Sequence, residues 1–155
     1  MERFVVSTAY TQKPRADRAM SALLQSGDAF VRHMRESDIA MVVDIERRSY
    51  DFPWSAGIFA DCIRVGYCSL VLELDDGLSG YGIMSVASDE SHILNVCIAP
   101  EARRKGCGKL LMDHLMTHAM KQGALKSYLE VRPSNTAAIA LYTDIGFNHV
   151  GTRRG

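Results

Sequence analysis

The amino-acid sequence predicts an α/β domain in which a central mixed sheet is flanked by helices. Short strand-like runs alternate with amphipathic helical segments along most of the chain, as expected when helices pack on the faces of a sheet. A glycine-rich turn joins one of these strands to the helix that follows it. The length of 155 residues suits one domain of ordinary size with a hydrophobic core.

The N-terminal part of the chain differs from the rest. Residues 1–28 lack a strong apolar alternation, and we expect them to form an N-terminal extension that need not be ordered. The domain itself is expected over residues 29–155. Within the extension, Ala16–Gln25 has the composition of a short helix, which would end at Gly27.

Apolar spacing and capping residues define the first elements of the domain. Phe30–Arg35 alternates and predicts a strand, and Ser37 is a suitable N-cap for the helix that follows. Pro53 ends this helical segment, because proline lacks a backbone donor and disfavours helix at the residue before it. Ser55 then caps a shorter helix. The residues expected to point inward from the longer helix are Ile39, Val42, Val43 and Ile45.

The second half of the chain contains a hairpin and two strand–helix units. Tyr67–Leu74 and Ser79–Ala87 are strands joined by the turn Asp75-Asp76-Gly77. The remaining elements are a strand over His92–Ile98, a helix from near Gly108 to Gly123, a strand over Ser127–Val131, a helix from Asn135 to Gly146 and a strand over Phe147–Thr152. This order of elements predicts a mixed sheet with helices on both faces.

The segment Arg103–Lys109, which reads RRKGCGK, is the most informative part of the chain. It lies between a strand and a helix, and its glycines let the backbone approach a ligand closely. Backbone N–H groups at such a turn bind anions, so we expect a phosphate or pyrophosphate ligand. The candidate binding residues are Arg103, Arg104, Lys105, Gly106, Cys107, Gly108 and Lys109.

Two common phosphate-binding motifs are excluded at this turn. A Walker A loop needs glycine at position 103 and serine or threonine after Lys109, where the chain has Arg103 and Leu110. A dinucleotide-binding fingerprint that starts at Gly106 needs a small residue in place of Leu111. Taken by itself, the segment also fits a basic turn that binds no ligand.

Charge and composition exclude several classes of partner. The chain has 18 basic and 18 acidic residues, whereas nucleic-acid-binding proteins are usually basic, so we expect no direct nucleic-acid binding. No apolar run approaches the ~20 residues of a membrane span, and the first residues resemble no secretion signal. The four cysteines form no CxxC pair, as in reduced proteins. These features predict a cytoplasmic protein without a membrane partner.

Metal binding and cysteine chemistry are not expected. His114 and His118 are spaced as two zinc ligands on a helix would be, but the HExxH motif is absent, so we interpret them as surface histidines. Cys97 and Cys107 have no recognisable histidine activator. We therefore expect both thiols to pack rather than to act as nucleophiles.

The glycine turn and four further segments resemble the GNAT superfamily of acetyl-coenzyme A-dependent N-acetyltransferases, and within it the bacterial ribosomal-protein-alanine N-acetyltransferases. The superfamily's cofactor-loop pattern Q/R-x-x-G-x-G/A coincides with Arg103, Gly106 and Gly108. The further segments are DFPWS (51–55), ESHILNVCIAP (90–100), LEVRPSNTAAIALY (129–142) and GFNHVGTRRG (146–155). The resemblance runs from about Phe30 to Gly155.

This resemblance implies roles for individual residues. The glutamate matching Glu130 is the general base that takes a proton from the acceptor amine, and the tyrosine matching Tyr142 protonates the leaving thiolate. The asparagine matching Asn135 contacts coenzyme A, although Asn135 is also suited to cap a helix. The strand residues whose backbone pairs with the pantetheine arm match Val96, Cys97 and Ile98.

The residue types themselves leave other interpretations open. Glu130 could be an exposed carboxylate at a strand end, or a partner for Arg132. Tyr142 lies on one helix face with Ala138 and Ile145, so it could simply pack in the core. The DFPWS segment could likewise contribute aromatic side chains to the core, whereas the resemblance implies one wall of a substrate groove.

The resemblance implies that the chain transfers acetyl from acetyl-coenzyme A to a protein N-terminal amine, first of all the N-terminal alanine of the eighteenth small-subunit ribosomal protein. Alternative acceptors are another N-terminus, a lysine or a small amine. A different class of function is a non-catalytic acyl-coenzyme A-binding module, which the presence of both Glu130 and Tyr142 argues against. The family continues past the position of Gly155 with one more strand, so we expect the last strand of the fold to be missing.

Overall fold

The computed structural model describes residues 2–9, 20, 22 and 27–154. Most of the expected helix over Ala16–Gln25 therefore lies outside the described residues. The strands are β1 (Arg3–Ala9), β2 (Phe30–His33), β3 (Cys68–Leu74), β4 (Gly77–Ala87), β5 (Glu90–Ile98), β6 (Lys126–Val131) and β7 (Asn148–Arg153). The described α-helices are α2 (Ile39–Ser49), α3 (Ala56–Arg64), α4 (Cys107–Lys121) and α5 (Thr136–Asp144).

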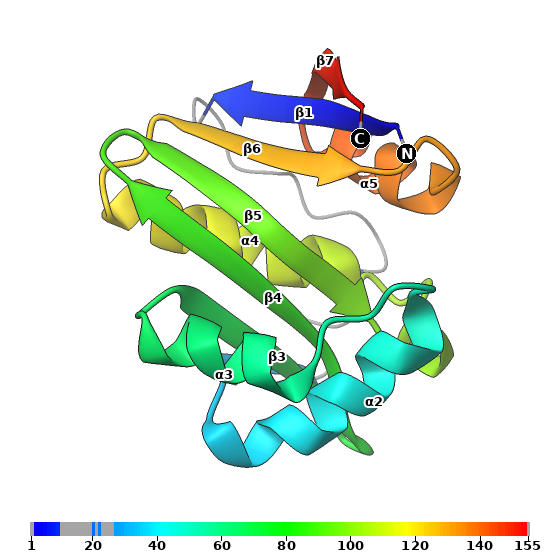
Figure 1. Ribbon diagram of the computed structural model, residues 1–155. Coiled ribbons are helices and arrows are strands. Elements are labelled where there is room, and N and C mark those ends of the chain that lie inside the picture. The colour runs from blue at the N-terminus through cyan, green and yellow to red at the C-terminus, as the bar shows by residue number, and fades with distance from the viewer. Residues whose placement is uncertain (1, 10–19, 21, 23–26, 155) are drawn as a thin grey trace.

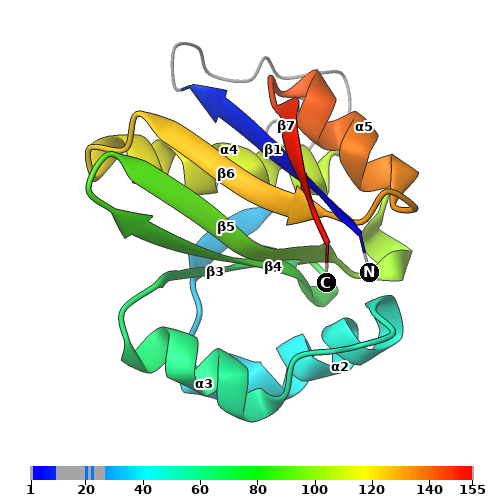
Figure 2. The same cartoon turned by 45° about the horizontal axis from the view of Figure 1, so that its top comes forward.

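The seven strands of the described residues form one sheet, in the order β2-β3-β4-β5-β6-β1-β7. Figure 1 labels the part of this sheet from β3 to β7. Only β5 and β6 run parallel, and every other neighbouring pair is antiparallel. Helices α2 and α3 cover one face of the sheet, whereas α4 and α5 lie on the other face (Figure 2). The predicted mixed sheet flanked by helices is confirmed.

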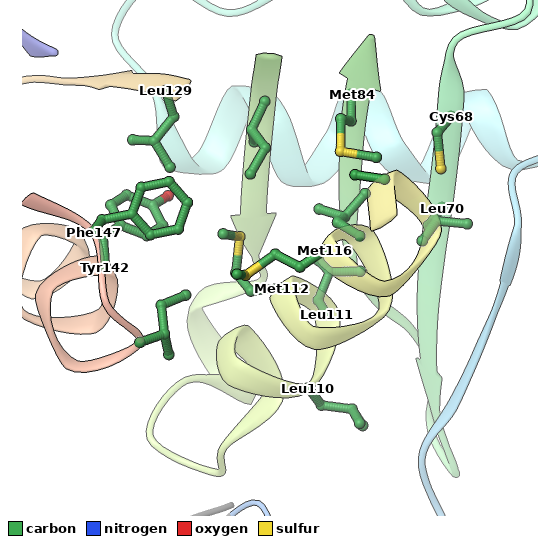
Figure 3. Packing of buried hydrophobic residues seen from close by; sticks show 14 of the residues in the cluster. Cys68, Leu70, Met84, Leu110, Leu111, Met112, Met116, Leu129, Tyr142 and Phe147 are labelled. Atoms are coloured by element: carbon green, nitrogen blue, oxygen red, sulfur yellow. The ribbon is translucent and has the colours of Figure 1, made fainter. Parts of the chain in front are cut away.

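The hydrophobic core has two parts, one on each face of the sheet. The larger part packs α4 and α5 against the sheet around Leu111, Met112 and Leu115, which are fully buried (Figure 3). The smaller part packs α2 and α3 around Phe59 and Tyr81, whose rings meet edge to face at 5.5 Å. Burial of these apolar surfaces on both faces provides the main driving force for folding.

Several local signals in the sequence are confirmed by the structure. The Ser55 hydroxyl caps α3 by accepting a hydrogen bond from the N–H of Ile58 at 3.3 Å. The turn at Asp75 and Asp76 joins β3 to β4, and Gly77 has a φ of +120° that favours glycine. Gly146 follows α5 with a φ of +105°, the left-handed conformation usual after a helix.

The expectation that Ser37 caps α2 is wrong. Residues Glu36–Asp38 form a 3₁₀ turn, and Asp38 occupies the N-cap position of α2. The Asp38 carboxylate accepts hydrogen bonds from the backbone of Arg35 at 2.7 Å and from the Arg32 guanidinium at 2.8 Å. The bond from Arg32 lowers the pKa of Asp38, because it stabilises the charged form. Asp38 therefore occupies the N-cap position by its backbone alone, because its carboxylate binds Arg35 and Arg32 and forms no hydrogen bond with the first turn of α2.

Strand β1 comes from the segment that the sequence analysis set apart as an N-terminal extension. It pairs antiparallel with β6, from Phe4 opposite Val131 to Ala9 opposite Lys126, and also with β7. Val6, at its centre, is 7% exposed and belongs to the larger part of the core. The sheet therefore has a strand between β6 and β7, and this strand comes from the start of the sequence.

Candidate active site

The candidate site lies where the parallel strands β5 and β6 separate. Their ladder pairs Glu90–Ile93 with Lys126–Leu129 and stops there. Strand β5 nevertheless continues to Ile98 beside β4, and β6 continues to Val131 beside β1. The two strands diverge toward their C-terminal ends, at Ile98 and Val131 (Figure 1). Helix α5 begins beyond the end of β6. The backbone of Val96, Cys97 and Ile98 lies along the divergent half of β5.

The glycine turn connects this half of β5 to the start of α4. Arg104 and Gly106 have left-handed φ values of +64° and +83°. The first backbone bond of the helix runs from the N–H of Leu110 to the carbonyl of Gly106 at 3.1 Å. Left-handed residues directly before a helix start are typical of the backbone nests that bind anions, and the first N–H groups of a helix have no partner within it.

The four cationic side chains of the turn lie in different environments. Arg104 and Lys105 are exposed at the turn. Arg103 donates from Nε to the carbonyl of Ile98 at 3.1 Å, so its side chain stabilises the turn against the end of β5. Lys109 is 7% exposed, and its Nζ lies 2.7 Å from Asp144 Oδ2. Lys109 thereby joins α4 to α5, and only part of the predicted cationic cluster faces solvent.

Gly108 and Cys107 begin α4 in close contact with neighbouring elements. A Cβ atom at Gly108 would lie 3.0 Å from Cδ2 of Leu141, so glycine lets α4 begin close to α5. Cys107 is 1% exposed, and burial raises the pKa of its thiol, so this side chain packs in the core. At the start of α5, Asn135 Oδ1 accepts a hydrogen bond from the N–H of Ala138 at 3.1 Å. Asn135 therefore caps α5, as its residue type predicted.

Glu130 lies near the end of β6 and is bracketed by two arginines. Its Oε1 is 2.8 Å from Nη1 of Arg153 on β7, and its Oε2 is 3.8 Å from Nη1 of Arg3 on β1. The Glu130 side chain is 29% exposed, so the carboxylate is accessible at the divergent end of the strand. Arg132 instead lies over the ring of Phe52, 5.6 Å from its centroid. Arg3 and Arg153, the two arginines beside Glu130, lie 150 positions apart in the sequence and meet through the pairing of β1 with β7.

Tyr142 has both a packing environment and a location beside β5. It is 8% exposed, belongs to the larger part of the core, and its ring lies 5.9 Å from that of Phe147 (Figure 3). Burial first, and then the nearby Cys97 thiol, raise the pKa of Tyr142 to about 12. The phenol consequently keeps its proton at neutral pH, as a proton donor must.

The structure places Tyr50 in the same region, although sequence reasoning did not identify it. Its hydroxyl donates to the carbonyl of Val96 at 2.8 Å, across 46 residues of sequence. Burial, followed by the proximity of Cys97, Tyr142 and Glu46, raises the pKa of Tyr50. The available signal was its position immediately before the DFPWS segment.

Phe52 and Trp54, from the DFPWS segment, take different environments. Phe52 is 70% exposed and contacts Arg132, which follows β6. Trp54 is half-buried, and its ring lies 5.4 Å from that of Phe59 on α3. The segment thus reaches from the smaller part of the core to the far side of the β5–β6 divergence.

The cysteines and histidines show no sign of a metal centre in the part of the chain that the structure describes. Cys62, Cys68, Cys97 and Cys107 are free and buried. Among the described residues, no three histidine, cysteine, aspartate or glutamate side chains are arranged to hold a metal ion. No helix in the described ranges is long and apolar enough to cross a membrane.

The fold is that of an acetyltransferase. The family model described as "Acetyltransferase (GNAT) family" matches residues 37–147, and the chain belongs to this family.

Individual relatives agree with this family membership. The ribosomal protein bS18-alanine N-acetyltransferase of Salmonella typhimurium is 37% identical over 76% of this chain and 80% of its own length. The crystal structure of the ribosomal-protein-S18-alanine N-acetyltransferase from Escherichia coli superimposes with a TM-score of 0.74 and 33% identity, over 79% of each chain. A putative acetyltransferase from Salmonella typhimurium, yncA, solved with its cofactor acetyl-coenzyme A, shares the fold at 19% identity and a TM-score of 0.69, over 80% and 82% of the two chains.

Proposed function

We propose that the chain transfers acetyl from acetyl-coenzyme A to the N-terminal amine of a ribosomal protein, with the N-terminal alanine of bS18 as its acceptor. The acceptor is proposed from the names of the relatives at 33–37% identity. The observation that carries the proposal is the separation of β5 from β6 beyond Ile93 and Leu129. Two further features support it: Glu130 lies near the end of β6, and Cys97 of β5 contributes to the raised pKa of Tyr142.

The glycine turn suits the phosphate groups of coenzyme A. Gly106 and Arg104 have the left-handed backbone of an anion-binding nest, and α4 begins immediately afterwards with the positive end of its dipole. The exposed side chains of Arg104 and Lys105 add positive charge beside the turn. When bound, acetyl-coenzyme A supplies an activated thioester. The backbone of Val96–Ile98 would lie alongside its pantetheine arm.

Glu130 and Tyr142 divide the proton transfers between them. The Glu130 carboxylate accepts a proton from the acceptor ammonium, whose ordinary pKa of ~7.7–8.0 makes this an easy transfer near neutral pH. The amine nitrogen then bonds to the thioester carbon while the carbon–sulfur bond breaks. Tyr142 donates its phenolic proton to the departing thiolate, which leaves as free coenzyme A, and the resulting phenolate takes up the second proton that the nitrogen loses as the amide forms. In this proposal the acceptor ammonium takes the place of the Arg153 guanidinium beside Glu130.

Mass spectrometry of acetyl transfer onto a panel of peptides tests the proposed acceptor. The panel contains the N-terminal bS18 peptide, the same peptide with a blocked N-terminus, peptides with other first residues, and a peptide whose only free amine is on lysine. We expect acetylation of the bS18 peptide at its α-amine alone. If another N-terminus or the lysine is acetylated in preference, the bS18 N-terminus is not the acceptor. Coenzyme A binding with no transfer to any amine would favour the non-catalytic binding module.

Substitutions in the turn test the backbone-binding model for coenzyme A. Gly106→Val should weaken coenzyme A binding about tenfold or more, because a β-branched residue strains a backbone held at positive φ. Lys105→Ala should have a much smaller effect, because it removes one exposed charge that solvent already screens. Gly108→Val should weaken binding as well, and should also lower stability through its contact with Leu141. Titration calorimetry that gives equal losses for all three variants would contradict the model.

A further inference from the structure

Glu46, on α2, is a buried carboxylate that three separate elements hold by hydrogen bonds. It is 2% exposed. Its Oε1 accepts from the hydroxyl of Tyr81 on β4 at 2.5 Å and from Nδ2 of Asn95 on β5 at 2.9 Å. Its Oε2 accepts from the backbone N–H of Trp54 at 2.9 Å. One side chain therefore connects α2, the sheet and the segment between α2 and α3.

Core stability alone does not explain this arrangement. Among the described residues, no lysine, arginine or histidine forms an ion pair with Glu46. Moving an unpaired carboxylate out of water is costly, and well-packed apolar residues usually serve a core at least as well. The Glu46 carboxylate accepts hydrogen bonds from three donors and so fixes their positions relative to one another. This positioning explains the buried carboxylate better than core stability does. Two of the donors belong to the sheet, and the third belongs to the Tyr50–Ser55 segment, which we call the acceptor loop.

A second contact holds the acceptor loop at the same part of β5. The backbone N–H of Tyr50 donates to the carbonyl of Glu46 at 3.0 Å and ends α2. The Tyr50 hydroxyl donates to the carbonyl of Val96, one residue beyond Asn95. The contact of Tyr50 with Val96 and the contact of Glu46 with Asn95 both reach β5 past Ile93, where its ladder with β6 has stopped. The loop is thus attached to the part of β5 that lies at the site.

The other end of the acceptor loop reaches across the divergence. Phe52 projects into solvent and contacts Arg132, two residues after Glu130. The position of this exposed ring depends on how the loop is attached at Trp54 and Tyr50.

We propose that Glu46 is a positioning residue, which holds the acceptor loop against β5 and so sets the shape of the acceptor side of the site. This inference rests on the proposed function, because it assumes that the loop faces the acceptor peptide. Glu46 acts through the N–H of Trp54 and does not touch the reacting atoms. The residue type alone does not single out Glu46, although its spacing from Val42 and Val43 places it on the inward face of α2.

Trp54 is the chain's one tryptophan, so its fluorescence reports on the acceptor loop directly. Glu46→Met keeps the side-chain length but removes both oxygens. We expect Trp54 to become more accessible to acrylamide and the KM for the acceptor peptide to rise about tenfold, as when a hydrogen bond to a charged group is lost. The KM for acetyl-coenzyme A should stay within about twofold, a change too small to reflect a lost hydrogen bond, because the Glu46 side chain bonds to Trp54, Tyr81 and Asn95 and not to the glycine turn, α4 or Val96–Ile98.

Two matched variants separate positioning from a merely structural role. Glu46→Gln keeps one oxygen, which can still accept from the backbone N–H of Trp54. The new amide N–H groups can donate to the Tyr81 hydroxyl and to the Asn95 amide oxygen, because both of these groups can also accept hydrogen bonds. Glu46→Gln should therefore restore most of the peptide KM and the shielding of Trp54. Tyr81→Phe removes a hydrogen bond to the same carboxylate but leaves the loop attached. It should lower the melting temperature without changing the peptide KM.

The outcomes are distinguishable from a failure of the proposed function. A lower melting temperature for Glu46→Met, with Trp54 shielding and peptide KM as in the parent chain, would overturn the positioning role. If circular dichroism shows that Glu46→Met does not fold, Glu46→Asp replaces it, because the shorter side chain withdraws the carboxylate from the loop. If the parent chain acetylates no N-terminal peptide, the proposed function fails. Trp54 quenching then still decides whether Glu46 holds the loop.

Discussion

Glu130→Gln is expected to lower the turnover number by roughly 10²–10⁴-fold, the range typical of lost general-base catalysis. The amide has nearly the shape of the carboxylate but cannot take the ammonium proton. Coenzyme A affinity should stay nearly unchanged, because the carboxylate serves the amine and the glycine turn serves the cofactor. Activity should partly recover at higher pH, where more of the acceptor amine is already deprotonated.

Two control variants separate base catalysis from the ion pairs of Glu130. Arg153→Ala removes the 2.8 Å contact but leaves the carboxylate, so turnover should be largely retained. Glu73→Gln changes another carboxylate near a strand end, which pairs with Arg32 at 2.8 Å away from the site. It should leave turnover unchanged. A Glu130→Gln variant with full activity at pH 7 would show that Glu130 is not the base.

Tyr142→Phe is expected to lower the turnover number by roughly 10²–10⁴-fold with little change in melting temperature. The substitution keeps the ring that packs against Phe147 and removes only the hydroxyl. Because burial raises the pKa of Tyr142 to about 12, the parent chain carries the proton at every pH used for the assay. The lost rate should therefore not be recovered by lowering the pH.

If Tyr142 has only a packing role, the same variant gives the opposite pattern. Turnover would stay near normal, and stability would fall by about 1 kcal/mol if a hydrogen bond were lost. Tyr81→Phe provides the comparison, because Tyr81 is fully buried and its hydroxyl donates to Glu46 away from the proposed proton transfers. Measuring rate and melting temperature on both variants decides between the two interpretations of Tyr142.

Much of this protein is determined by signals that act over a few residues. The hairpin turn at Asp75-Asp76-Gly77, the cap at Ser55 and the glycine after α5 each satisfy local backbone geometry, and each is found where the sequence predicts it. The same holds for the glycine turn, because its left-handed residue at Gly106 and the helix start that follows are local features. Strand and helix periods of 2 and 3.6 residues likewise depend only on near neighbours.

Tertiary structure alone decided how distant segments meet. Strand β1 has only seven residues, and its place between β6 and β7 depends on partners at the other end of the sequence. Ser37 is an acceptable cap by residue type, yet Asp38 occupies the N-cap position, and the guanidinium of Arg32 from β2 holds its carboxylate away from the helix N–H groups. Lys109 belongs to the cationic turn by sequence, yet Asp144 from α5 draws it into an ion pair.

The candidate site shows the same division. The residue types and spacing of the 129–142 segment single out Glu130 and Tyr142, but do not indicate that Arg3 and Arg153 bracket the carboxylate. Nor could the sequence show that Glu46 connects α2 to the acceptor loop. Periodicity assigns a residue to a buried face, whereas the partner on that face depends on which elements the packed sheet brings into contact. Hydrogen bonds and ion pairs between distant segments form only after that packing exists.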